Sequence, residues 1–320
     1  MSRRHQVIEL LSIGRRTLDD DEIAARLDMN RHYVNQVCRK LAADGMVERS
    51  LGRDSKYVNR LSDSGAPTAN ADLPQPVHTT EPRRRRDVRE RANIETLVAD
   101  FDACISQFES SNAFPGPSLY FHERALAQRS LHSNAPELLN DKLFLEYVYA
   151  VLPAWGMHRM GNQRAKVVDF SDMADSLRSA AIPIDRLWSR QITNVGADEA
   201  AALAEDVWRI IASLRVSRSE TRIVAGSKAL HHVLPNLVPP IDRQYTFRFF
   251  TGQKAVNRGD ERAFLDWFPL LCEIGRRCRA EIEATLERGG VMATSRSKVI
   301  DNAIVGFMQR TDRDVRDAAP

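Results

Sequence analysis

The sequence predicts a mainly α-helical protein, in which a small N-terminal domain with a β-hairpin is joined by a flexible linker to a larger all-α domain. Apolar residues recur at three- and four-residue spacings along most of the chain, which is typical of amphipathic helices. Strand-like runs occur only within residues 46–61. Residues 62–88 are rich in Pro, Ser, Thr and Asn, with almost no large apolar side chain, so they predict a linker. The expected domains are therefore 1–61 and 89–320.

The composition is that of an ordinary globular protein, with 43% hydrophobic and 28% charged residues among 320. No apolar run approaches the roughly 20 residues of a membrane-spanning helix. The N-terminus lacks the apolar stretch of a secretory signal. The four cysteines are too few for a disulfide scaffold of this size. We therefore expect a cytoplasmic protein without a membrane partner.

Arginine dominates the basic residues, since only 7 of the 46 are lysines, and the net charge is +3. Its forked contacts suit phosphates and guanine edges, although the codon bias of a GC-rich genome explains the same excess. An arginine run, Arg83–Arg86 followed by Arg89 and Arg91, closes the linker. This run would either add phosphate contacts without sequence preference or only keep the linker solvated and extended.

The N-terminal domain begins with three predicted helices, over residues 5–12, 21–27 and 31–45. Acidic residues suit the start of the second helix, Asn30 is a plausible cap for the third, and Gly45 ends it. Two strand-like runs then flank Gly52-Arg53-Asp54, which predicts a hairpin.

The order helix, helix, turn, helix and hairpin resembles the winged helix-turn-helix family, in which the third helix enters the DNA major groove. The resemblance implies DNA contacts from the third helix and the wing, by Arg31, His32, Asn35, Gln36, Arg39, Arg53 and Lys56. The alternative is a winged helix that serves protein contacts or dimerisation. A helix face that binds protein is expected to be more apolar. The outward face of the predicted third helix is instead polar and basic, and it has no carboxylate before Asp44.

The C-terminal domain is predicted to be all-α, and the expected helices lie near 93–110, 118–132, 136–152, 171–181, 198–214, 219–233, 243–251, 260–287 and 295–310. Strand patterns, GxGxxG and GxxxxGK[ST] are missing, which excludes Rossmann folds and P-loop NTPases. Neither HExxH nor a metal-type cysteine spacing occurs, because Cys272 and Cys278 stand alone. We therefore expect no metal and no cofactor.

One unusual segment is 147–161, where aromatic and basic residues surround a break at Pro153. Its candidate site residues are Tyr149, Trp155, His158 and Arg159. Such residues at a broken helix end would form a base-stacking pocket, or else the packed end of a helix.

The second unusual segment is 223–247, in which Gly226-Ser227-Lys228 precede His231 and His232 on an apolar helix. A proline-rich turn follows, and Asp242 heads the next helix. An aspartate at this place has a simple explanation as a helix cap.

The combination of these two features resembles the helix-hairpin-helix DNA glycosylase superfamily. The resemblance implies that Gly226 and Ser227 belong to a hairpin that grips DNA phosphates, with Arg243 as a further DNA contact. It also implies that Pro240-Ile241-Asp242 carries the essential aspartate, and that Lys228 stands where members that cut the backbone have a lysine. The sequence departs from the usual hairpin, since it has VAGS instead of L-P-G-V-G, and Lys228 and Asp242 are closer together than usual.

The resemblance implies an enzyme that flips a base out of double-stranded DNA and cleaves its glycosidic bond. Asp242 would stabilise the positive charge on the sugar and orient water, or Lys228 would attack the sugar carbon. Trp155 or a nearby tyrosine would stack on the base, and His158, His231 or His232 would protonate it or bond its edge. Relatives act on damaged bases or on hypermodified cytosines of phage DNA, as an antiviral defence.

Two other classes of function remain open. One is a transcription regulator, whose helical domain binds a ligand or dimerises. The other is a non-catalytic interaction protein with an exposed apolar surface. The sequence favours the glycosylase, because a regulator's helical domain has no reason to place Lys228 and Asp242 around a Gly-containing turn.

Overall fold

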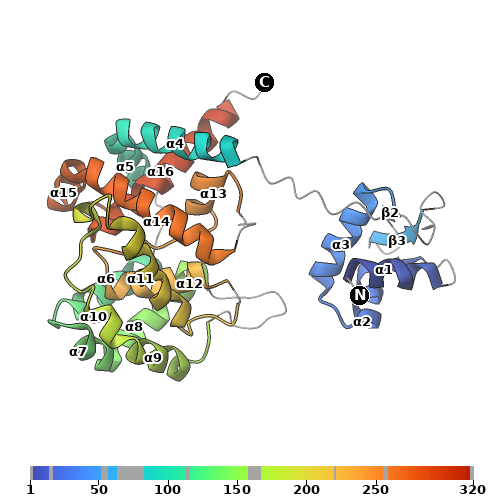
Figure 1. The fold of residues 1–320 in the computed structure, drawn as a ribbon, viewed down its shortest axis with the longest axis horizontal. Coiled ribbons are helices and arrows are strands. Elements are labelled where there is room, and N and C mark those ends of the chain that lie inside the picture. The colour runs from blue at the N-terminus through green and yellow to red at the C-terminus, as the bar shows by residue number, and fades with distance from the viewer. Residues whose placement is uncertain are drawn as a thin grey trace. The chain divides into compact units, whose positions relative to one another are not determined.

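The computed structural model describes residues 3–13, 17–51, 57–62, 83–111, 116–157, 167–219, 221–254 and 259–317. The chain divides into two compact units, Met1–His78 and Thr79–Pro320, each of which is considered by itself (Figure 1). The described residues are mainly helical, as predicted. Among these residues, no helix is long and apolar enough to cross a membrane.

The first unit combines three helices with a small antiparallel sheet. Its elements are α1 (Arg3–Ser12), β1 (Leu18–Asp19), α2 (Asp20–Leu27), α3 (Arg31–Ala43), β2 (Val47–Leu51) and β3 (Tyr57–Leu61). The strand order is β1-β3-β2, and the β2–β3 pairing runs from Val47 opposite Leu61 to Leu51 opposite Tyr57. The sequence analysis does not predict the two-residue strand β1. The apolar stripes of the three helices meet in one core, formed by Val7, Leu11, Ile23, Val34, Cys38 and Leu41.

In the part of the second unit that the structure describes, the regular elements are helices, and one isolated β-bridge joins Val167 to Ser217. The α-helices are α4 (Arg83–Ala99), α5 (Phe101–Ser110), α6 (Pro117–Arg129), α7 (Ala135–Asn140), α8 (Lys142–Leu152), α9 (Phe170–Ser179), α10 (Ala181–Asp185), α11 (Ala200–Ser213), α12 (Arg222–Val233), α13 (Thr246–Thr251), α14 (Asp260–Arg277), α15 (Arg279–Arg288) and α16 (Arg296–Asp317). Helix α4 begins inside the range 62–88 that the sequence analysis assigns to a linker. Three expected helices, 93–110, 136–152 and 260–287, each prove to be two, and the short α10 after the expected helix 171–181 is not predicted.

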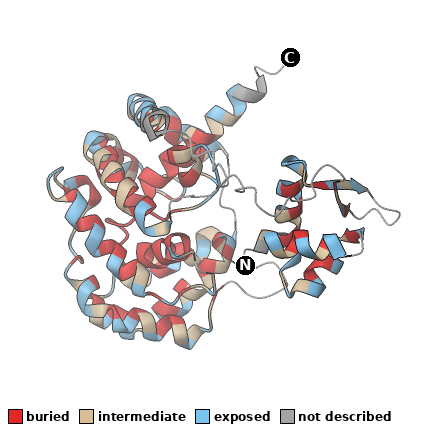
Figure 2. Ribbon diagram, turned by 45° about the vertical axis from the view of Figure 1, so that its right-hand side comes forward, coloured by how far each residue is buried: buried red, intermediate tan, exposed pale blue. Residues whose placement is uncertain are grey.

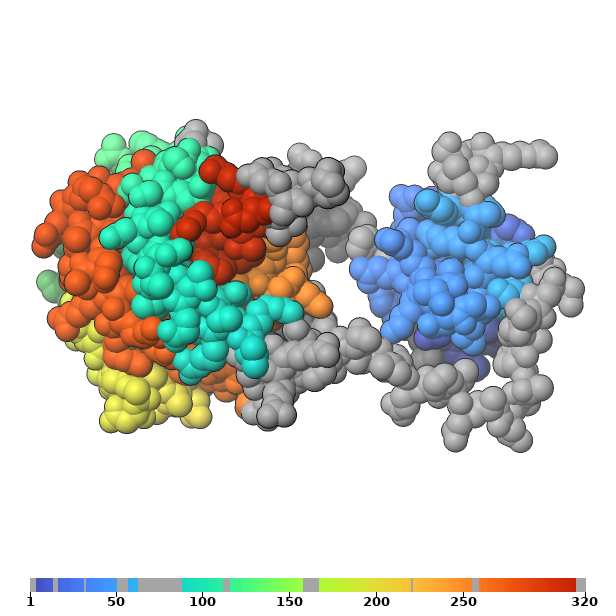
Figure 3. Space-filling view, turned by 90° about the horizontal axis from the view of Figure 1, so that it is seen from above, coloured from blue at the N-terminus to red at the C-terminus, as the bar shows by residue number. Residues whose placement is uncertain are grey.

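Helix α12 lies at the centre of the second unit, and every residue from Ile223 to Val233 is buried (Figure 2). It packs closely on α11, because a Cβ added at Gly226 would lie 2.7 Å from Ile211 Cγ2. Helix α16 packs along α5 and also contacts α4, beside which it lies in Figure 3. This arrangement brings the first half of α16 against the end of α12 and the turn that follows it.

Candidate functional site

Buried polar side chains are concentrated on α12. Ser227, Lys228, His231 and His232 are all at most 9% exposed. Burying a polar or charged group is unfavourable unless it is hydrogen bonded. Such groups in the middle of a core helix therefore mark a candidate site, and their partners show what the site is made of.

Lys228 and Trp155, which come from the two unusual segments, meet in the structure. The Lys228 ammonium donates a hydrogen bond to the Trp155 carbonyl oxygen at 2.7 Å. Trp155 lies in a π-helical turn, Pro153–Met157, at the end of α8, where Gly156 takes a positive φ of 86°. The turn frees this carbonyl from regular α-helical pairing, so the predicted break at Pro153 presents it to α12.

The Trp155 side chain is a wall of the site. Its indole nitrogen donates to the Ser118 carbonyl oxygen at 3.2 Å, and its ring lies 5.0 Å from His122 and 4.9 Å from His232. Only 7% of the residue is exposed. His122 and His232 pack against this ring, and its stacking on a base stays a prediction.

Asp242 is held in place by the turn that precedes α13. Its Oδ1 accepts the Tyr245 amide at 2.7 Å, and its own amide donates to Thr246 Oγ1 at 3.2 Å. The Ile241 amide donates to Ser227 Oγ at 3.0 Å, which ties the turn to α12. Asp242 therefore makes capping interactions at the start of α13, and its carboxylate stays partly exposed.

Asp301 on α16 joins Lys228 and Asp242 in one electrostatic group. Burial raises the pKa of Asp301, nearby Lys298 lowers it, Asp242 raises it and Lys228 lowers it. Lys298, which is 1% exposed, donates to Asp301 Oδ2 at 2.7 Å and to Asn302 Oδ1 at 2.5 Å. We call Lys228, Asp242, Lys298 and Asp301 the charge quartet.

Lys298 and Asp301 were missed by the sequence analysis. The available signal was a Lys, Asp and Asn at positions i, i+3 and i+4 within an otherwise apolar stretch of α16. The same spacing is typical of exposed helical ion pairs, so the pattern alone does not indicate burial.

Two histidines, His122 and His232, form a buried chain of hydrogen bonds that ends on the Lys228 carbonyl oxygen. His122 Nδ1 lies 3.1 Å from His232 Nε2, and His232 Nδ1 lies 2.8 Å from the Lys228 carbonyl oxygen. A carbonyl only accepts, so we assign the protons to Nδ1 of His232 and Nδ1 of His122. Burial lowers the pKa of His122, His231 and His232. The chain is therefore neutral at pH 7, and His122 is a member that the sequence analysis missed.

The other predicted pocket residues are placed differently. The Tyr149 hydroxyl donates to the Val168 carbonyl oxygen at 3.0 Å, and its ring packs on Phe170. His231 Nδ1 bonds the Val238 carbonyl oxygen at 2.8 Å. These two residues pack the core, and His158 and Arg159 lie outside the described residues.

The predicted hairpin is not formed by Gly226 and Ser227. Both are buried inside α12, which begins four residues before Gly226, at Arg222. Gly226 instead permits the close packing of α12 on α11. Arg243 is exposed beside Asp242 and donates to Thr221 Oγ1 at 3.0 Å.

In the first unit, the outward face of α3 is basic. Arg31 and Arg39 are exposed, and so is Lys40, which the sequence analysis did not select. Arg31 pairs with Asp21 at 2.7 Å. The side chain of His32 and the wing residues Arg53 and Lys56 lie outside the described part of the chain.

Asn35 faces partly inward, which differs from the prediction that it contacts DNA. Its amide donates to Asp20 Oδ2 at 2.8 Å, and Arg49 contacts the same oxygen at 2.7 Å. Asn59 Nδ2 donates to Asp20 Oδ1 at 2.9 Å. This buried polar network fixes α3 to α2 and the sheet.

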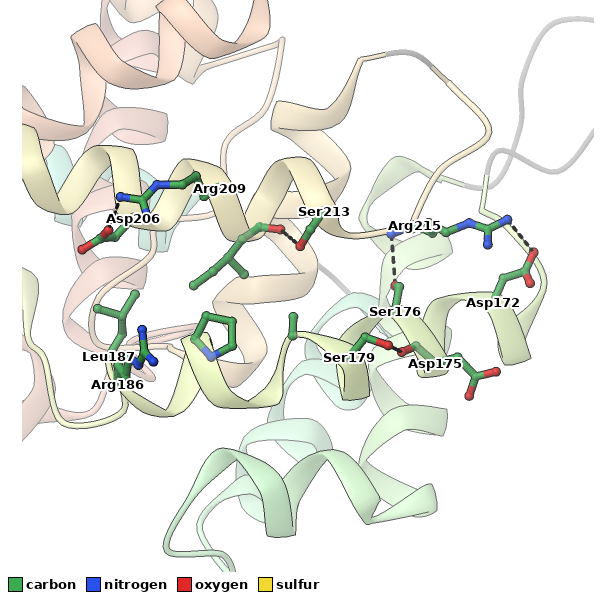
Figure 4. Close-up of a pocket in the computed structure, with 13 residues that line it drawn as sticks. Asp172, Asp175, Ser176, Ser179, Arg186, Leu187, Asp206, Arg209, Ser213 and Arg215 are labelled. Carbon is green, nitrogen blue, oxygen red and sulfur yellow. Dashed lines mark hydrogen bonds and ion pairs between the residues drawn. The ribbon is translucent and has the colours of Figure 1, made fainter.

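A cavity of about 580 Å³ lies between α9, α10 and α11 (Figure 4). Ala180, Pro183, Leu187 and Ile210 supply its apolar lining, and arginines and aspartates surround them. It shares no residue with the charge quartet. A smaller hollow of about 310 Å³ is nearer the quartet, because Tyr245, whose amide bonds Asp242, lines it with Gln107, Gln244 and Gln309.

Among the described residues, no group of three His, Cys, Asp or Glu side chains could hold a metal ion. Comparisons with family models, curated proteins and solved structures give no match for this chain. The chemistry must therefore be inferred from the charge quartet itself.

Proposed function

We propose that this protein is a DNA glycosylase, which flips a damaged or modified base out of a duplex and cleaves its N-glycosidic bond. One observation carries the proposal: the Ile241 amide bonds Ser227 Oγ at 3.0 Å, which holds the turn that bears Asp242 against the part of α12 that bears Lys228, beside the wall formed by Trp155. A nucleophilic amine and a partly exposed carboxylate in one place are the two groups that glycosidic chemistry uses.

Asp242 supplies the electrostatic part of the reaction. As the bond between the sugar C1′ and the base nitrogen breaks, positive charge develops on the sugar. An ionised carboxylate stabilises this charge and orients the water that attacks C1′, while the departing base takes a proton. The bonds from Tyr245 and Thr246 hold Asp242 in place before the substrate arrives.

Lys228 offers a second route, in which its amine attacks C1′ and displaces the base. The hydrogen bond to Trp155 fixes the amine at the wall of the site. The exposed basic face of α3, together with the winged arrangement of β2 and β3, would add affinity for the duplex. A cytoplasmic setting fits the four buried, free cysteines.

The test is base excision from a panel of duplexes that contain uracil, alkylated, oxidised or glucosylated bases, with hot alkali to cut abasic sites. Asp242→Asn should lower the excision rate by about 100-fold or more. Asp141→Asn is the matched control, because Asp141 also accepts backbone amides at a helix start, those of Leu143 and Phe144 at the beginning of α8. It should leave excision unchanged.

A transcription regulator is the second candidate, and the cavity between α9, α10 and α11 favours it because a regulator needs a ligand site. This function predicts sequence-specific duplex binding that Asp242→Asn leaves intact. Absence of cutting on every duplex, together with such binding, would reject the glycosylase in favour of the regulator.

A further inference from the structure

The charge quartet contains an ion pair that neither proposed reaction route uses. Lys298 and Asp301 are 1% and 5% exposed, and their charged atoms lie 2.7 Å apart. Apolar side chains of similar size commonly stabilise a core as well as a buried ion pair does, or better. A buried pair next to reactive groups is therefore poorly explained by stability alone.

We propose that Lys298 and Asp301 are positioning residues of this site, and that the Asp301 carboxylate sets the charge of the Lys228 amine. This inference rests on the proposed function, because it deepens the role of Lys228. The geometry places the pair beside Lys228, because the Lys228 ammonium bonds the Trp155 carbonyl oxygen at 2.7 Å, the Lys298 ammonium lies 5.8 Å from the Trp155 ring, and Lys298 holds Asp301 at 2.7 Å. Lys228 and Asp301 attract each other, so the Asp301 charge favours the ammonium form of Lys228. Lys298 opposes that effect, and the balance between the two sets how readily Lys228 becomes a nucleophile.

The surroundings of the pair define which charges matter. Asp301 accepts a hydrogen bond from Lys298 on its own helix, and Lys298 also donates to Asn302. Lys228 on α12 and Asp242 before α13 act on Asp301 electrostatically.

Lys298 lies 5.4 Å from the Phe108 ring and 5.8 Å from the Trp155 ring. It also lowers the pKa of His122, His231 and His232, which stay neutral. Asp301 and Lys298 are thus the charges on α16 that lie beside Trp155 and the buried histidines.

The experiment uses the full-length protein and a duplex that already contains an abasic site, so it does not depend on base excision. The Lys228 amine attacks the aldehyde carbon of the ring-opened sugar, and water leaves as the imine forms. Borohydride then adds hydride to the imine carbon and leaves a stable secondary amine. The amount of covalent adduct is measured as a function of pH.

The wild-type protein should form an adduct that Lys228→Met abolishes. Asp301→Asn keeps the size of the side chain but removes its charge, so half-maximal trapping should move about one unit to lower pH. The double variant Lys298→Met/Asp301→Leu removes both charges and should move the midpoint back toward the wild-type value. Asp312→Asn, which removes a carboxylate farther along α16 that pairs with Arg248, should cause no shift. Thermal unfolding checks that each variant is folded.

Three results would overturn this inference: an unchanged midpoint in Asp301→Asn, an equal shift in the single and double variants, or no Lys228-dependent adduct from the wild type. Failure of the proposed function is a separate result, because it appears as the absence of excision from every modified duplex. A protein that forms the adduct with the expected shifts but excises no base would keep the charge coupling and lose the glycosylase.

Discussion

The buried histidines make stability depend on pH. Burial lowers the pKa of His232 from 6.5 to about 4, and His122 and His231 shift in the same direction. Between these values the unfolded chain binds protons that the folded chain does not. Stability is therefore fully present above pH 6.5 and falls as the pH is lowered toward 4. Each proton contributes a slope of about 1.4 kcal/mol per pH unit.

Asp301 works in the opposite direction, because burial raises its pKa and the folded state then binds a proton more readily. Asp301 is one group that binds a proton more readily in the folded state, whereas the three buried histidines bind protons less readily. The free energy of unfolding should therefore still decrease on acidification. Urea unfolding between pH 7.5 and 5, followed by tryptophan fluorescence, measures this slope. His232→Gln should reduce it. An unchanged slope in His232→Gln would contradict the assignment.

The site was partly predictable at the scale of residues. Lys228, Trp155 and Asp242 could be selected because a polar residue in an apolar helix, or after a proline-rich turn, stands out locally. Lys298, Asp301 and His122 could not, since their burial depends on how α16 and α6 pack around α12. Trp155 could be selected from the sequence, but the histidine against its ring could not, because the position of His232 relative to Trp155 depends on the tertiary structure.

At the scale of elements, Gly306 fixes the contact between α16 and α5. A Cβ added there would lie well inside van der Waals contact of the Cys104 carbonyl oxygen and 2.8 Å from its carbonyl carbon. Backbone of a helix cannot move aside as a side chain can. Gly306→Ala should therefore destabilise the second unit by about 2 kcal/mol, although alanine is the better helix former by about 1 kcal/mol.

Gly275→Ala in α14 is the matched control, because its added Cβ would meet the Ile192 oxygen and Ile300 Cδ1 at 3.2 Å. We expect a smaller loss, and urea unfolding curves of the two variants measure the difference. An equal or greater loss in Gly275→Ala would contradict the packing of α16 on α5.

The residue ranges that form helices were predicted well, but the places where one helix ends and the next begins were predicted poorly. The apolar pattern continues across Asp100 and Cys278, so 93–110 and 260–287 each look like one helix in the sequence. Gly226 shows a related limit. Its place before Ser227 and Lys228 suggested a hairpin, but glycine also serves where two helices pack closely, and α12 and α11 use it in that way.

At the scale of the whole molecule, the proposed function would divide between the two compact units, with duplex binding on the first and base excision on the second. All four tryptophans lie in the second unit, so their fluorescence reports on the unit that contains the charge quartet and not on α3. A net charge of +3 gives the chain little overall attraction to DNA. Duplex binding would therefore depend on basic residues that are concentrated on one surface. The exposed face of α3 provides such a concentration, with Arg31, Arg39 and Lys40.

This division predicts that binding and chemistry respond to different substitutions. Arg39→Ala should weaken duplex binding several-fold and reduce the slope of log affinity against log salt by about one, since one phosphate contact is lost. Excision at saturating protein should stay unchanged in Arg39→Ala, whereas Asp242→Asn should lose excision and keep the salt slope. Arg26→Ala, at an exposed position on α2, is the control for loss of a positive charge from the same unit. Binding titrations from 50 to about 200 mM salt measure the slope. If Arg39→Ala and Arg26→Ala changed the slope equally, α3 would have no special place in DNA binding, and the duplex would have to be held by the helical unit alone.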